Sequence, residues 1–116
     1  MLKLHTVSAA PSAPTSLNFT STGTTWVQLN WSPPATPNGL ISYYTVVLNS
    51  TSSSVTLNTS SDSNWLNATD LVPCTLYTFA VSATTGCGAE CTGPLSAAIY
   101  VSTAANSMRT LLFTVE

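Results

Sequence analysis

The sequence predicts an all-β fold in which seven strands form two sheets packed face to face. Short segments alternate apolar and polar residues with a period of two, and turn-forming residues separate these segments. No segment shows a convincing apolar stripe at helical spacing. Seven such strands within about 90 residues are typical of a two-sheet sandwich.

The expected strands cover residues 16–20, 25–31, 41–48, 54–58, 65–71, 76–83 and 95–103. Two prolines in Ser32-Pro-Pro34 end the second strand, because proline donates no hydrogen bond to a sheet. Pro37-Asn-Gly39 predicts a turn before the third strand. Three glycines within residues 84–94 indicate a loop before the last strand. The candidate core residues are Trp31, Tyr44, Leu71, Tyr77, Phe79 and Val81.

The strands also carry spaced motifs. In chain order these are Pro11-x-x-Pro14, Leu29-Asn-Trp31-Ser-Pro-Pro34, Asn38-Gly39-x-Ile41-x-x-Tyr44-x-Val46 and Leu71-x-Pro73-x-Thr75-x-Tyr77-x-Phe79-x-Val81-x-Ala83, followed by the glycine-rich loop. On these motifs, residues 11–103 resemble a fibronectin type III domain. The resemblance implies an immunoglobulin-like sandwich with sheets A-B-E and C′-C-F-G, the letters following the strands in chain order.

The resemblance also implies roles for single residues. Trp31 would be the core anchor. The hydroxyl of Tyr77 would bond to the backbone of the preceding loop, an arrangement called a tyrosine corner. Cys74 departs from the family pattern, which usually has glycine there, and the cysteines of the last loop depart from it too.

The composition excludes several classes of protein. Two Lys+Arg and four Asp+Glu make 5% of the chain charged, against about 25% in an average domain. Two cations cannot form a nucleic-acid surface, and no apolar run reaches the ~18 residues of a membrane span. The sole histidine, His5, and the scattered carboxylates offer no catalytic or zinc-binding set. We therefore expect no enzyme activity, no cofactor and no metal.

Five Asn-x-Ser/Thr sequons, at Asn18, Asn30, Asn49, Asn58 and Asn67, occur together with three cysteines. This combination favours a secreted or cell-surface glycoprotein; the alternative is a bacterial secreted module without N-glycans. Alternation points Asn18, Asn30, Asn49 and Asn67 outward, and Asn18, Asn30 and Asn67 share the A-B-E face. Trp65 should lie opposite Asn30, with Trp26 nearby. Either these indoles pack on glycan, or neighbouring side chains or another domain cover them.

Cys87 and Cys91 lie in the last loop, and their pairing is the first hypothesis. Cys74 lies at the other end of a strand about 26 Å long, whereas a disulfide needs Cα atoms within about 7 Å. It therefore cannot pair with its own loop. It is either a buried free thiol or the partner of a neighbouring domain's loop.

The two ends of the chain resemble each other. With a shift of 94 residues, six of the sixteen positions in 7–22 are identical to those in 101–116. Residues 1–10 are then the end of a preceding repeat or an N-terminal flanking strand, and 11–104 are the domain. Residues 105–116 are the first strand of a next repeat or a pairing strand. The apolar residues of this assembly strand, to be buried by the next domain or a neighbouring subunit, are Leu111, Leu112, Phe113 and Val115.

The first functional hypothesis is a non-catalytic structural or adhesive repeat of a secreted, glycosylated extracellular fibre, matrix or adhesion protein. It would act through end-to-end contacts with neighbouring fibronectin type III domains or identical subunits. One alternative is a ligand-binding domain of a cell-surface receptor, using the B–C and F–G loops or the C-F-G face, which is poor in sequons. That face would be lined by Thr45, Val47, Ala80 and Tyr100. A further alternative is a spacer in a secreted carbohydrate-active enzyme.

Overall fold

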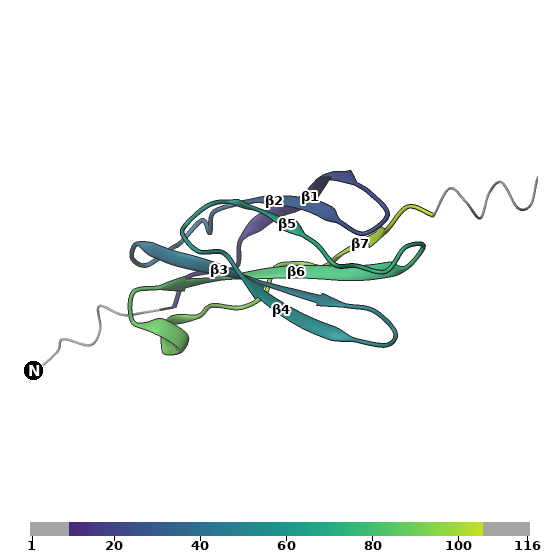
Figure 1. Cartoon of the computed structure of the whole chain (residues 1–116). Helices are drawn as coiled ribbons and strands as arrows, with labels where there is room; N and C mark the ends of the chain where they lie inside the picture. The colour runs from purple at the N-terminus through teal and green to yellow at the C-terminus, as the bar shows by residue number, and fades with distance from the viewer. Residues whose placement is uncertain (1–9, 106–116) are drawn as a thin grey trace, which may run out of the picture.

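A computed structural model describes residues 10–105, which form seven strands and one short 3-10 helix (Figure 1). The elements are β1 (Thr15–Thr22), β2 (Val27–Ser32), β3 (Ile41–Asn49), β4 (Ser54–Asn58), β5 (Trp65–Ala68), β6 (Leu76–Thr85), η2 (Gly88–Cys91) and β7 (Ile99–Ser102).

The strands form two antiparallel sheets that pack against each other. One sheet has the order β1-β2-β5, and the other has the order β4-β3-β6-β7. In the lettering above these are A-B-E and C′-C-F-G, so the predicted fold class and sheet order are confirmed. Figure 1 shows the three-stranded sheet as one layer and the longer β3 and β6 at the centre of the other.

Two strands are shorter than the alternation predicts. β5 ends at Ala68 because Asp70 adopts a left-handed backbone with φ of 62°, which an extended strand cannot contain. β7 begins at Ile99 rather than at residue 95. Three residues before β7, Ser96 Oγ accepts the hydrogen bond of the Val81 N–H. In a continuing strand, a backbone carbonyl would accept this bond. In both places local polar geometry replaces the ladder that periodicity alone predicts.

The core lies between the sheets and consists of the inward positions of both. All six candidate core residues are buried there, with Val27, Leu29, Val46, Leu48, Ala68, Ala83 and Val101. Trp31 of β2 meets Tyr44 of β3 edge to face, with ring centroids 5.2 Å apart. This contact links the two sheets, because Trp31 belongs to one sheet and Tyr44 to the other.

The connection from β5 to β6 is fixed at two points. Leu71 is buried, and its N–H donates to the carbonyl of Thr25 at 2.9 Å. The next N–H, that of Val72, donates to the hydroxyl oxygen of Tyr77, also at 2.9 Å. The Tyr77 hydroxyl therefore bonds to the backbone of the preceding loop, the arrangement that the family resemblance implies.

The proposed flanking segments lie outside the described residues. Leu111, Leu112, Phe113 and Val115, together with most of 1–10 and 105–116, belong to these parts of the chain. The repeat interpretation and the boundaries at 11 and 104 therefore remain predictions.

Replacing Trp31 with alanine should lower the free energy of unfolding by about 3–5 kcal/mol, because it leaves a cavity between the sheets. Trp65→Ala is the matched control: Trp65 is 55% exposed, so its loss should cost about 1 kcal/mol or less in unglycosylated protein. Urea unfolding of both variants checks this. Equal costs for the two tryptophans would contradict the assigned core.

Replacing Tyr77 with phenylalanine should cost about 1 kcal/mol, because the ring stays in place while the Val72 N–H loses its acceptor. Tyr100→Phe, at an exposed ring, should change nothing measurable. Thermal or urea unfolding compares the two. An unchanged Tyr77→Phe stability would mean that water replaces the corner hydrogen bond without loss.

Candidate functional site

The outer face of β1-β2-β5 brings together three sequons and one exposed tryptophan. Asn18 pairs with Asn30 across β1 and β2, and Asn30 pairs with Trp65 across β2 and β5. Gln28 pairs with Asn67 in the same way. The row Asn18–Asn30–Trp65 is the register that alternation predicts, and all of these side chains are exposed or half-buried.

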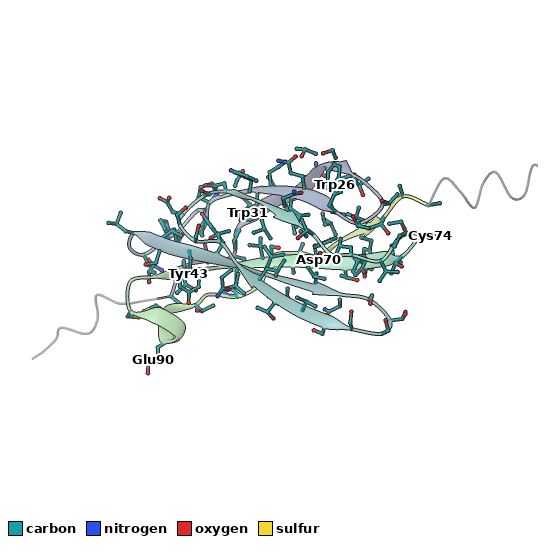
Figure 2. All side chains as sticks on the ribbon, in the orientation of Figure 1. Trp26, Trp31, Tyr43, Asp70, Cys74 and Glu90 are labelled. Carbon is teal, nitrogen blue, oxygen red and sulfur yellow. A yellow bond between two sulfur atoms is a disulfide. The ribbon has the colours of Figure 1, made fainter. Side chains whose placement is uncertain are left out.

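A groove of about 500 Å³ crosses this face at its β2–β5 side. We call it the tryptophan groove; its lining residues are Thr25, Trp26, Gln28, Trp65, Asn67, Thr69 and Asp70. The indole of Trp26 packs against Gly23, and this position requires glycine because a Cβ there would overlap the indole. Figure 2 shows Trp26 on the outer side of this sheet, away from Trp31 in the core.

Strict alternation on either side of Asn18 predicts that Leu17 and Phe19 both point inward, and for Phe19 this is wrong. Phe19 is 41% exposed, whereas Leu17 packs partly against the core. β1 is an edge strand with two register shifts, and Ser16 has a positive φ of 57°. These irregularities turn the strand, so strict alternation does not hold along it.

The outer face of the other sheet carries small and hydroxyl side chains around Tyr100. Thr45, Val47 and Ala80 are half-buried there, and Tyr100 is 68% exposed. The remaining two sequons lie on the same face. Asn49 pairs with Thr78, and Asn58 Oδ1 accepts a hydrogen bond from Thr45 Oγ1 at 2.9 Å. This face therefore holds two sequons, against three on the opposite sheet.

The described chain begins at one end of the sandwich. Asn38 Nδ2 donates to the carbonyl of Ala10 at 2.8 Å, so Ala10 lies beside the β2–β3 loop. In that loop Leu40 is 89% exposed, and it shares a shallow hollow with Thr85 and Cys87. We call this surface the leading end.

The chain leaves at the opposite end, which we call the trailing end. Cys74 N–H donates to the carbonyl of Ala104 at 3.2 Å, and Ala104 N–H donates to the carbonyl of Gly23. In the loop that carries Cys74, Val72 is 59% exposed. Periodicity could not have singled out Leu40 or Val72, because both lie in loops.

The cysteines lie at these two ends; Figure 2 labels Cys74 at one end and Glu90, which lies between Cys87 and Cys91, at the other. A disulfide joins Cys87 to Cys91 across η2, with Cα atoms 5.5 Å apart, at the leading end. Cys74 is a free thiol at the trailing end. It is exposed, so the interpretation as a buried thiol is wrong. Its φ of 55° explains why the family pattern usually has glycine there, since this conformation costs other residues about 1 kcal/mol.

The described residues show no arrangement for acid–base or metal chemistry. No group of three or more His, Cys, Asp and Glu that could hold a metal ion occurs among residues 10–105. Burial raises the pKa of Tyr44, and the negative charge of Asp62 raises it further, so this hydroxyl stays protonated near neutral pH. Within the same residues, no helix has the length and apolar character that crossing a membrane requires.

A three-plus-four sandwich with a tyrosine corner defines the class of domain, and comparison with known proteins agrees. Residues 12–101 match the fibronectin type III domain, and the chain belongs to that family.

Chicken protein sidekick-2 is 36% identical over 88 residues, a match that covers 70% of this chain and 4% of sidekick-2. The FN5 domain of Drosophila Lar is 26% identical with a TM-score of 0.68, over 84% of this chain and all of that one. The third fibronectin III domain of human KIAA0343 has a TM-score of 0.77 at 16% identity, over 91% and 92% of the two chains, and supports the fold alone.

Replacing Cys87 and Cys91 together with alanine should lower the free energy of unfolding by about 2 kcal/mol, the loop-closure value for so short a separation. Cys74→Ser should stay within about 0.5 kcal/mol of the parent, because its side chain is exposed. Urea unfolding of both variants without reductant measures this. Equal stability of the double variant and the parent would show that the bridge does not hold the η2 loop.

Proposed function

We propose that this domain is one repeat of an extracellular adhesion- or receptor-type protein, in which it acts as a non-catalytic spacer with end-to-end contacts. The main supporting observation is that Ala10 and Ala104 lie at opposite ends of the sandwich, and that each end exposes an apolar side chain. Exposed apolar groups at a chain exit gain most by packing on the next domain.

The chemistry of the two ends supports this pairing. Leu40 at the leading end and Val72 at the trailing end are both apolar. In a head-to-tail array, Val72 and Cys74 of one repeat would face Leu40 and the Cys87–Cys91 loop of the next. An interdomain bridge from Cys74 would require that loop to open its own disulfide, so the non-covalent contact is the simpler form of the proposal.

The relatives support the array and its setting. The similar Lar domain is the fifth of its kind in its protein, and the chain matches 4% of sidekick-2, which leaves room for many more domains. A disulfide and five sequons suit an oxidising, glycosylating compartment. Secretion into a fibre or matrix is the more specific form of this proposal, with neighbouring domains or identical subunits as partners.

Two copies of residues 11–104 joined head to tail test the proposal. Each copy should gain about 1 kcal/mol in free energy of unfolding over the single domain, because the two ends bury each other. Val72→Ser in the first copy or Leu40→Ser in the second should abolish the gain. Differential scanning calorimetry and urea unfolding measure it.

Leu95→Ser is the matched control. Leu95 is also an exposed leucine, but it adjoins Ser96, which bonds to Val81 in the middle of β6, away from both ends. Independent unfolding of the two copies would refute the end-to-end contact. It would favour the ligand-binding alternative, for which Tyr100, on the β4-β3-β6-β7 sheet, is the most exposed aromatic side chain among residues 10–105.

A further inference from the structure

The Asn67 sequon differs from the other four in what precedes it. Trp65 stands two residues before Asn67, whereas serine, glutamine, valine and threonine stand at that position before the others. Alternate residues of a strand share a face, and their Cα atoms are about 7 Å apart. Trp65 and Asn67 are both exposed on the outer face of β5. The indole therefore lies beside the carboxamide, within reach of a group attached to it.

A second indole lies on the other side of Asn67. Gln28 is the cross-strand partner of Asn67, and Trp26, just before β2, lines the same tryptophan groove. Gly23 leaves the space that the Trp26 ring occupies, because a Cβ at that position would overlap the indole. Asn67 thus opens into a groove of about 500 Å³ with an indole toward either end, a size typical of small-ligand sites.

The lining suits the core sugars of an N-linked glycan. An N-acetylglucosamine ring has an apolar C–H face that packs on an aromatic ring, and hydroxyl and acetamide groups that need hydrogen-bond partners. Besides the indoles, the lining offers Gln28, two threonines and Asp70. The core sugars are uncharged, and Asp70 is the single charged residue of the lining, so the charges are compatible. Among the described residues, no hydrogen bond ties down the exposed carboxamide of Asn67.

We propose that Asn67 carries an N-linked glycan whose first sugars lie in the tryptophan groove and cover Trp65 and Trp26. The proposal rests on the extracellular function above. In the transfer, Nδ2 of Asn67 forms a bond to C1 of the first N-acetylglucosamine of a lipid-diphosphate-linked oligosaccharide. The bond from C1 to the diphosphate oxygen breaks, Nδ2 loses one proton, and the lipid diphosphate leaves.

Packing of this kind makes the stability of the domain depend jointly on the glycan and on Trp65. Because the sugars are covalently attached to Asn67, their effective concentration near the indole rings is high. Even a weak contact between sugar and indole is therefore formed most of the time. Removing either partner should abolish the same increment of stability. This is the signature that a double-mutant cycle detects.

The test uses the full chain secreted from eukaryotic cells, with site occupancy read by peptide mass spectrometry. Asn67→Gln and Trp65→Val are made singly and together, and urea unfolding is measured for each. With Trp65 present, the glycan at Asn67 should lower the unfolding equilibrium constant about tenfold; with Trp65→Val, less than about twofold. Asn58→Gln, at a sequon preceded by Thr56, is the matched control and should show no coupling to Trp65.

A second measurement trims the glycan. An endoglycosidase that leaves one N-acetylglucosamine on each asparagine is applied to the parent chain and to Asn67→Gln, because an amidase would turn each asparagine into a charged aspartate. The single sugar should retain most of the stability gain and should lower acrylamide quenching of tryptophan fluorescence, because it covers Trp65 and Trp26. Trp31 is buried in either form and adds a constant background.

The outcomes separate the two proposals. Occupied sequons elsewhere with a bare Asn67 would overturn the groove assignment and leave the extracellular function standing. An occupied Asn67 without coupling to Trp65 and without protection from quenching would overturn the packing. If no sequon is occupied, both the glycosylated setting and the groove assignment fail.

Discussion

The edge-to-face contact between Trp31 and Tyr44 is the constraint on which the rest of the structure depends. It joins β2 of one sheet to β3 of the other, and the inward sides of both strands are fixed once these two rings face each other. A strand that points Trp31 inward must point Asn30 and Gln28 outward. The core contact therefore determines which side chains line the outer face, including the cross-strand partners of Trp65 and Asn67. The register that buries the core residues therefore also places the side chains of the outer face.

The chain has few charged residues, and hydroxyl groups form polar contacts that ion pairs would otherwise make. Thr84 bonds to Thr92 at 2.7 Å beside the disulfide loop, and Thr103 Oγ1 donates to the carbonyl of Val72 at 2.6 Å beside the tyrosine corner. These short bonds hold loops to strands without ion pairs, so salt should weaken them little. A chain with few charged residues also lacks long-range steering. Contacts with partners are then expected to come from close packing of apolar groups, as proposed for the two ends, rather than from charge complementarity.

Much of the fold could be predicted because period-two alternation reports burial directly. It identified β2, β3 and β6, and the core residues predicted on them, Trp31, Tyr44, Tyr77, Phe79 and Val81, are all buried. It failed where a single residue changes the backbone. Asp70 ends β5 early by its positive φ, and Ser96 uses its hydroxyl in place of a strand partner. The exposure of Cys74 follows from the turn that holds it. The groove was foreseen only as two nearby indoles, since the role of Gly23 depends on how the β1–β2 loop folds back.

The opposite placement of the two chain ends also determines how the domain carries a mechanical load. The terminal strands β1 and β7 belong to different sheets, and tension between the ends runs along the strands rather than across them. The backbone hydrogen bonds of a strand are then loaded together in shear, instead of opening one after another. β7 is joined to β6 by four residue pairs, against five between β1 and β2, so we expect β7 to yield first. Its release would free Ala104 from Cys74 and expose the trailing end, while the small loop closed by Cys87 and Cys91 stays intact and adds almost no length to the extended chain.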